Sequence, residues 1–240
     1  MSTSNFKAEF LGGARAGVPV VLGFIPVGIA FGIMARQAGF EIWQTCGFSV
    51  FVYAGASQMM TVGMYAQGAS IIAMVLATFL LNFRHLIMST CVFERIKEST
   101  FKQKLIAGFG VTDESFALFT TEKEERCTIA YFIGMNCVMY TSWNVGTFIG
   151  AIASDFLPVI ITASLGIALY AMFIGLLVPN ITKNFRLGML VVLTAICNTV
   201  LCQFMPGSWA LICSTLLCAF IGVFTVDLDG SKEECADESH

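Results

Sequence analysis

Ionisable side chains interrupt long apolar runs of this sequence, first of all Arg84 and His85 in the run LATFLLNFRHLIMSTCVF. Such groups are costly at membrane depth, and they face the interior of a helix bundle or a water-filled cavity. They therefore predict a pathway for a substrate or for protons. Asn82 belongs with His85, because residues three positions apart share one face of a helix.

The chemistry of Arg84 and His85 allows two interpretations of each. The planar guanidinium of Arg84 can clamp a substrate carboxylate through two parallel hydrogen bonds, or its long side chain can carry the charge to the membrane interface beside a basic loop. His85 is either a structural histidine or a proton-linked group, because an unperturbed imidazole titrates near physiological pH. The sequence leaves these alternatives open.

Two adjacent acids, Asp113 and Glu114, stand in a second apolar stretch, GFGVTDESFAL. Their charge requires compensation, by the ammonium group of a substrate, by Arg84, or by protonation. Thr112 equally predicts a helix N-cap, with both acids in the first turn, where the backbone dipole favours them. The two interpretations are compatible.

A third group of candidates is Ser57 and Gln58 in VYAGASQMM, residues 52–60. Its small residues permit close helix packing, which is their commoner role in membranes. Alternatively, the helix is broken here, and its freed N–H groups and dipole receive a carboxylate. Trp143 and Asn144, in YTSWNVG, are weaker candidates, since Trp143 is more typical of helix packing.

The composition requires a lipid bilayer around these residues. The 240 residues are 57% hydrophobic and 12% charged, with a mean hydropathy of +0.80, whereas soluble domains are about 25% charged. A membrane helix needs about 20 apolar residues, so the length allows about six to eight passes and leaves no room for a soluble domain. We therefore expect an all-α polytopic integral membrane protein.

Two of the apolar segments contain helix-breaking residues. Pro19 and Pro26 interrupt residues 18–35, and glycines interrupt residues 105–121. We expect broken or re-entrant helices at both places, lining one cavity, because irregular backbone at membrane depth occurs only where protein or a water-filled cavity covers it. The full set of apolar segments is 18–35, 43–66, 70–91, 105–121, 128–153, 158–178, 187–203 and 207–226.

Basic residues place three loops in the cytoplasm by the positive-inside rule: residues 93–104, the Lys123/Arg126 loop and the Lys183/Arg186 loop. Because only residues 105–121 separate the first two loops, this segment should enter and leave the membrane on one side. By analogy, two interrupted segments suggest the discontinuous helices of secondary transporters.

Residues 1–226 are expected to form a single transmembrane transporter domain whose first hydrophobic segment is retained rather than cleaved as a signal peptide. Residues 227–240 carry six acids against one lysine and are expected to form a solvated, disordered tail. The nine cysteines contain no C-x-x-C pair, so they are interpreted as packing residues. Neither a metal nor a cofactor is expected.

Four strings occur in this order: GARAGVPVVLGFIPVGIAFGIMARQAGF, YAGASQ, LNFRHLIMS and GFGVTDESFAL. Together they resemble the AzlC family, named for azaleucine resistance and regarded as the large permease subunit of branched-chain amino acid exporters. The resemblance extends over roughly residues 12–226. It implies a multi-pass protein of the bacterial cytoplasmic membrane that exports valine, leucine, isoleucine or similar amino acids with a small hydrophobic AzlD-like subunit.

The resemblance assigns no residue roles, so the substrate-binding candidates rest on chemistry: Ser57, Gln58, Asn82, Arg84, His85, Asp113 and Glu114. A zwitterion needs an anion-binding group, an ammonium-binding group and an apolar pocket. We expect Arg84 or the amides near Ser57 to hold the carboxylate, Asp113 or Glu114 to hold the ammonium, and Met, Phe and Trp side chains to form the pocket.

Other functional classes remain alternatives to a proton-linked amino acid exporter. One is a transporter or channel for another small zwitterionic or polar solute, although a channel needs a polar stripe through the whole membrane, whereas polarity here is concentrated in the interrupted segments. The other is a membrane-embedded enzyme, for which His85 with Asp113 is the candidate dyad.

Overall fold

The structure is a computed structural model that describes residues 3–96, 99–156 and 185–225, with Ile174, Val178, Ile181 and Thr182. All regular elements in these residues are helices, which confirms the all-α expectation. The acidic tail, and the expected segment 158–178 apart from Ile174 and Val178, lie outside the described residues.

The chain divides into two compact units, which are described separately. The first contains residues 1–68 and 78–169, and the second contains residues 69–77 and 170–240. The single domain expected for residues 1–226 therefore stays a prediction.

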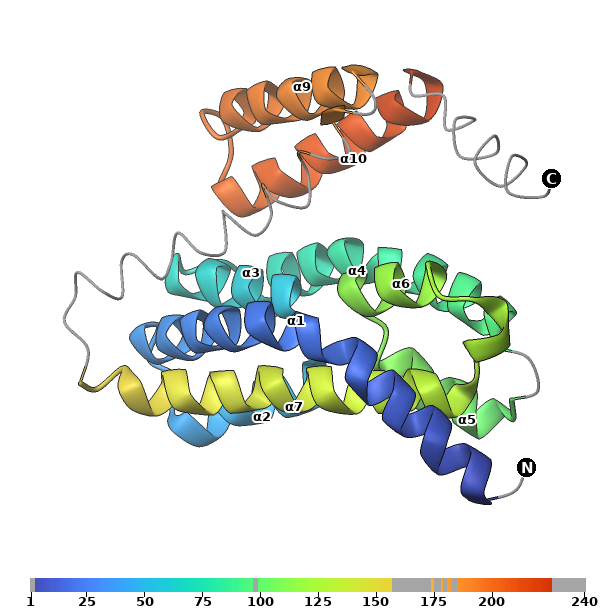
Figure 1. The fold of residues 1–240 in the computed structure, drawn as a ribbon. Coiled ribbons are helices and arrows are strands. Elements are labelled where there is room, and N and C mark those ends of the chain that lie inside the picture. The colour runs from blue at the N-terminus through green and yellow to red at the C-terminus, as the bar shows by residue number, and fades with distance from the viewer. Residues whose placement is uncertain are drawn as a thin grey trace. The chain divides into compact units, whose positions relative to one another are not determined.

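Helix α1 (Thr3–Gln37) packs along α7 (Ile129–Ala153), and the two form the centre of the first unit (Figure 1). Helix α1 passes through Pro19 and Pro26 without ending. The break that we predict in residues 18–35 is therefore wrong. The helix bends instead (Figure 1), because a neighbouring helix can compensate for the hydrogen bonds that proline removes.

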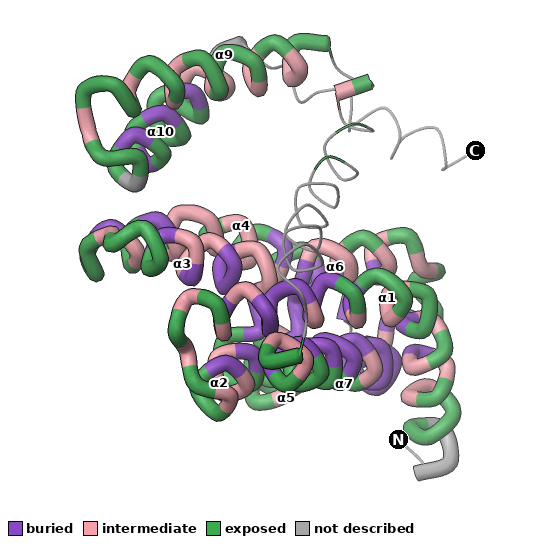
Figure 2. The backbone as a smooth tube through the Cα atoms, turned by 90° about the vertical axis from the view of Figure 1, so that its left-hand side faces the viewer, coloured by how far each residue is buried: buried purple, intermediate pink, exposed green. Residues whose placement is uncertain are grey.

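Glycines bring the backbones of α1 and α7 into direct contact. A Cβ atom added at Gly32 would overlap the carbonyl oxygen of Thr147, and one added at Gly150 would overlap that of Ile29. Burial is concentrated along α7 and on the side of α1 that meets it (Figure 2). Small residues at helix crossings are the usual means of close packing in membranes.

We expect Gly32→Ala to destabilise the first unit, whereas Gly23→Ala on the same helix should be neutral or slightly stabilising. A Cβ at Gly23 has no heavy atom within 4 Å, while overpacking at Gly32 typically costs about 1–3 kcal/mol. Thermal unfolding of both variants in detergent measures the difference. Equal midpoints for Gly32→Ala and the unmodified chain would contradict the tight α1–α7 contact.

The apolar segment 43–66 forms two helices, α2 (Ile42–Val52) and α3 (Gly55–Ala66). Tyr53 between them is left-handed, with φ 42° and ψ 44°, which is unusual for a bulky residue. In a continuous helix the Val50 carbonyl would accept a bond from the N–H four residues on. Here it accepts one from the Tyr140 hydroxyl at 2.9 Å instead.

The segment 105–121 is broken, as predicted. Helix α5 (Phe101–Phe109) and helix α6 (Asp113–Thr120) are separated by residues 110–112. Both helices begin at a threonine cap, Thr100 for α5 and Thr112 for α6. Glycine breaks the first helix, and the threonine starts the second.

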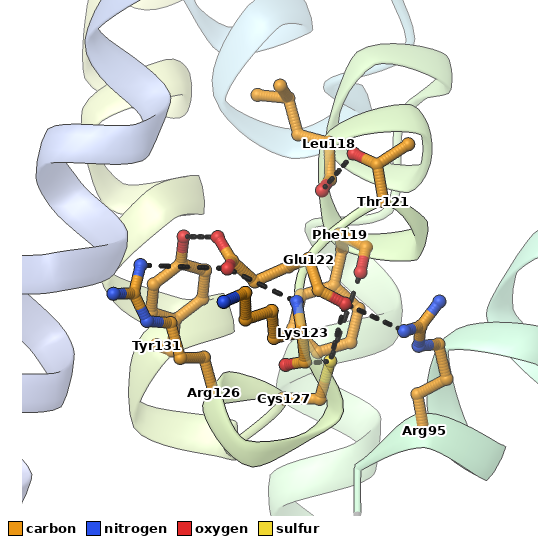
Figure 3. Close-up of polar contacts among 9 residues, drawn as sticks. All are labelled: Arg95, Leu118, Phe119, Thr121, Glu122, Lys123, Arg126, Cys127 and Tyr131. Carbon is orange, nitrogen blue, oxygen red and sulfur yellow. Dashed lines mark hydrogen bonds and ion pairs between the residues drawn. The ribbon is translucent and has the colours of Figure 1, made fainter. Parts of the chain in front are cut away.

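Helix α4 (Ile71–Arg95) precedes this pair, and its Thr78–Arg95 part belongs to the first unit. The Arg95 guanidinium donates one hydrogen bond to the Thr120 carbonyl oxygen. It donates another, at 2.8 Å, to the Glu122 carbonyl oxygen (Figure 3). The end of α4 therefore meets the end of α6. The chain between the end of α4 and the end of α6 therefore starts and finishes at the same place. A segment that enters and leaves a membrane on one side must do the same.

In the second unit, α9 (Phe185–Leu201) and α10 (Gly207–Thr225) pack on each other. The Ser214 hydroxyl donates to Asn198 Oδ1 at 3.4 Å. These helices confirm the expected segments 187–203 and 207–226 and carry none of the candidate residues.

Helix length and exposure fit a lipid environment. Residues Phe6–Gln37 and Ile71–Arg95 are each long and apolar enough to cross a bilayer. Large apolar side chains are also exposed along α4 and α5, where a soluble protein would carry polar ones. In α5 and in the Thr78–Arg95 part of α4 they are Phe79, Phe83, Leu86, Ile87, Phe101, Leu105, Ile106 and Phe109.

Candidate functional site

The two helix breaks lie together in the first unit. The ring of Tyr53, at the α2–α3 break, lies 6.0 Å from the ring of Phe109, which ends α5. Tyr140 of α7 contacts both, at 4.9 Å from Tyr53 and 6.0 Å from Phe109. These aromatic rings join the two breaks to α7.

The four short helices are each about half the length of a membrane span. Helices α2, α3, α5 and α6 contain 11, 12, 9 and 8 residues, which corresponds to about 12–18 Å at 1.5 Å per residue. The hydrocarbon core of a bilayer is about 30 Å thick. In a membrane, breaks of this kind would therefore lie near the midplane.

Arg84 of α4 and Asp113 of α6 form an ion pair, with Nη2 and Oδ2 2.9 Å apart. Pairing with Arg84 is one of the three ways in which the charge of the acids was expected to be compensated. Arg84 therefore pairs within the bundle. Its Nε is buried and has no hydrogen-bond partner. The guanidinium therefore keeps one buried N–H donor without a partner.

The N-cap interpretation of the acids is confirmed at the same time. The Thr112 hydroxyl accepts from the Ser115 N–H at 3.2 Å, and Ser115 Oγ accepts from the Thr112 N–H at 2.8 Å. Asp113 and Glu114 thus occupy the first turn of α6, where the helix dipole stabilises negative charge.

Glu114 and His85 lie around this ion pair. Glu114 is within electrostatic range of Asp113, Arg84 and the Tyr53 hydroxyl. His85 is within range of Arg84 and Asp113. The structure therefore gathers the four ionisable candidates into one cluster beside the α5–α6 break.

Ser57 and Asn82 connect α3 to α4. The Asn82 amide donates to Ser57 Oγ at 3.1 Å, and Ser57 Oγ donates to the Ala54 carbonyl at 3.0 Å. Ala54, the N-cap residue of α3, provides no side-chain cap. The close packing and the helix break expected for this segment are both present. Binding of a carboxylate there stays a prediction.

Gln58 takes part in a different set of hydrogen bonds from Ser57 and Asn82. Its Nε2 donates to Ser49 Oγ at 3.2 Å, and Ser49 Oγ lies 2.8 Å from Thr147 Oγ1. Gln58 thus belongs to a buried network that links α2, α3 and α7. A substrate-binding role for Gln58 stays a prediction. The observation that supports it is that the buried Oε1 atom has no hydrogen-bond partner.

The two weaker candidates lie on α7. A Cβ at Gly55 would be 2.7 Å from the Trp143 ring, so Trp143 packs against the start of α3. The Asn144 amide donates to the Tyr140 carbonyl of its own helix at 2.9 Å. Trp143 therefore borders the α2–α3 break, whereas Asn144 bonds within α7.

Two residues of this region were missed by the sequence analysis, Tyr53 and Asn136. Asn136 lies beneath the α5–α6 break, because a Cβ at Gly110 would be 2.8 Å from Asn136 Cγ. The sequence did contain a signal for Asn136, because an amide side chain inside an apolar helix is the same kind of feature that made Asn82 a candidate. Tyr53 gave no comparable signal.

A polar cluster at the loop between α6 and α7 holds the end of α6 in place (Figure 3). The Tyr131 hydroxyl donates to Glu122 Oε2 at 2.5 Å, and Arg126 lies 3.6 Å from Glu122 Oε1. The hydrogen bond from Tyr131, with a smaller contribution from Arg126, lowers the pKa of Glu122. Together with Arg95, this cluster fixes the ends of α4 and α6 to the start of α7.

Comparisons with known proteins point to one family. The family model described as AzlC protein matches residues 19–157, a range that contains all the candidate residues. Inner membrane protein YgaZ of Escherichia coli (strain K12) is 32% identical over 186 residues, which are 74% of this chain and 76% of that protein. Branched-chain amino acid transport protein AzlC of Bacillus subtilis (strain 168) is 25% identical, over 75% of this chain and 71% of that protein.

A third relative, from Archaeoglobus fulgidus, is named an uncharacterized membrane protein and is 30% identical over 75% of this chain and 80% of its own length. No solved structure matches this chain. The names of these relatives confirm that the helices described above are those of an integral membrane protein.

Proposed function

This chain belongs to the AzlC family, and from that premise we propose that it exports branched-chain or related neutral amino acids across the bacterial cytoplasmic membrane. It is a helical membrane protein with a role in transport. The name of the Bacillus subtilis relative supports the class of substrate.

The observation that carries the proposal is the ionisable cluster around the Arg84–Asp113 pair, placed beside two helix breaks. A zwitterionic substrate offers one carboxylate and one ammonium. The cluster offers a guanidinium whose Nε has no partner, and two carboxylates. Discontinuous helices at such a place are typical of secondary transporters, whose sites lie near the membrane midplane.

Arg84, Asp113 and Glu114 each have a role in substrate binding. The substrate carboxylate binds Arg84, whose Nε has no partner, with the N–H groups at the start of α3 as an alternative. The ammonium binds Glu114 and Asp113. Substrate binding thus competes with the Arg84–Asp113 contact, so an empty site is closed by its own ion pair.

Export is coupled to protons through Glu114 or His85. Both lie within electrostatic range of Arg84 and Asp113, so a proton on either changes the charge that the substrate meets. An imidazole and a carboxyl group inside a membrane protein are the side chains most often used in proton relays.

A small hydrophobic AzlD-like subunit completes the transporter. The exposed apolar side chains of α4, Phe79, Phe83, Leu86 and Ile87, offer it a surface within the membrane. The alternative function is movement of another small zwitterionic or polar solute through the same cluster, by transport or through a channel.

Efflux from cells tests the proposal. Cells loaded with labelled valine, leucine, isoleucine or lysine would express this chain with and without the small subunit. We expect saturable efflux of the three branched-chain amino acids, no efflux of lysine, and loss of efflux when the proton gradient is collapsed. Efflux equal to that of cells with empty vector, with or without the subunit, would refute the function.

A further inference from the structure

We propose that the cavity between Tyr53, α5 and α7 is the subsite that receives the apolar side chain of the exported amino acid and selects it by size. This inference rests on the proposed function and adds the residues that determine specificity. None of them was a candidate from the sequence.

The cavity has a volume of about 290 Å³. Ligand pockets generally span about 300–1,000 Å³, so this one is suited to a small solute. Its walls are mainly apolar, with Phe109, Phe132, Ile133 and Tyr140 among them. Gly110, in the α5–α6 break, also lines it, so the cavity adjoins the turn that carries Asp113 and Glu114.

Two buried polar atoms belong to residues that line the cavity, and neither has a partner. They are the hydroxyl of Tyr53 and the Oδ1 atom of Asn136, on side chains from residues 3% and 8% exposed. Buried polar groups nearly always have partners in folded proteins. Two exceptions on one cavity point to a ligand that supplies hydrogen-bond donors.

The chemistry of that ligand follows from the orientation of Asn136. Its Nδ2 donates to the Phe132 carbonyl at 3.0 Å, so the free Oδ1 is an acceptor. The Tyr53 hydroxyl is within electrostatic range of Glu114. An ammonium group held near Glu114 would donate to Asn136, while the side chain on the same carbon would enter the apolar part of the cavity. A lipid acyl chain would leave both polar atoms unpaired.

A cavity-enlarging substitution tests the selection by size. In cells that express the full chain with the small subunit, Ile133→Ala should raise the ratio of phenylalanine to valine efflux on the order of 10-fold, because each methylene of fit in an apolar pocket is worth about that factor. Ile149→Ala is the matched control, since Ile149 is an exposed residue of α7 outside the cavity. Ile133→Val serves if Ile133→Ala does not fold, with a smaller shift in the same direction.

The outcomes separate this inference from the proposed function. If the unmodified chain exports no amino acid, both are overturned. If it exports valine and the ratio is the same in the Ile133 and Ile149 variants, the cavity is not the subsite, while the proposed function stands.

A second variant tests the polar end of the cavity. Asn136→Leu should raise the half-saturating concentration about 10-fold or more for every exported amino acid, because a hydrogen bond to a charged group is lost. The ratio between amino acids should stay unchanged, and Asn136→Asp should retain affinity. Unchanged half-saturation in Asn136→Leu would overturn the ammonium contact.

Discussion

Replacing Arg84 by glutamine is expected to abolish export and to reduce the amount of folded protein, whereas the double variant Arg84→Gln/Asp113→Asn should regain the folded protein without export. The single change leaves the Asp113 carboxylate without its partner at 2.9 Å. Removing one member of a fully buried ion pair costs about 3–5 kcal/mol, whereas replacing both members is often neutral.

The expected loss of stability lies below that range. The side chains of Arg84 and Asp113 are 37% and 31% exposed within the first unit, so solvent or another polar group screens part of the charge. Size-exclusion chromatography of detergent extracts measures the folded amount, and efflux of labelled leucine measures export.

A second arginine–aspartate pair provides the control. Arg36 Nη2 lies 3.0 Å from Asp155 Oδ1, in the same unit but away from both breaks. The double variant Arg36→Gln/Asp155→Asn removes the same charges and should export leucine at the normal rate. Normal export by the Arg84/Asp113 double variant would instead mean that this pair is structural.

Glu114→Gln is expected to keep the fold and to lose export. Glutamine has the shape of glutamate but has no negative charge and cannot take up and release a proton. Loss of a charged contact costs about 1.5–3 kcal/mol, which corresponds to a loss of affinity of about 10- to 150-fold. The half-saturating concentration and the dependence of efflux on the proton gradient both need to be measured.

The control for Glu114 is Glu125→Gln, which removes an exposed carboxylate from the connection between α6 and α7. Glu125→Gln should change neither the half-saturating concentration nor the dependence of efflux on the proton gradient. If Glu114→Gln lowers the affinity but efflux still responds to the proton gradient, His85 is the proton-linked group. If neither quantity changes, Glu114 is not part of the site.

Much of the candidate site could be predicted from the sequence because its signals are local. Arg84, His85, Asp113 and Glu114 are conspicuous among apolar neighbours. The break in residues 105–121 was also predictable, since a glycine ends α5 and a threonine with its own hydrogen bonds starts α6 within a few residues. Composition alone determined the helical membrane class.

Other features were decided by contacts between distant segments. Prolines suggested a break in α1, but close packing on the glycines of α7 keeps it continuous. The break at Tyr53 depends on Tyr140, which binds the carbonyl that α2 leaves free. The glycines of α1 permit the first contact but do not identify α7 as its partner, and the local sequence of α2 does not indicate the second.

The pairing of Arg84 with Asp113 is a further case of this kind. The sequence offered three compensations for the acids, and only the structure brings Asp113 of α6 to Arg84 of α4. The cavity beside Asn136 likewise exists only because α5 and α7 meet there. Local chemistry fixes where charges lie along the helices and where caps such as Thr112 start a helix, because these effects act within one or two turns. Which charges meet, and which polar atoms are left unpaired, depends on how the helices pack in three dimensions.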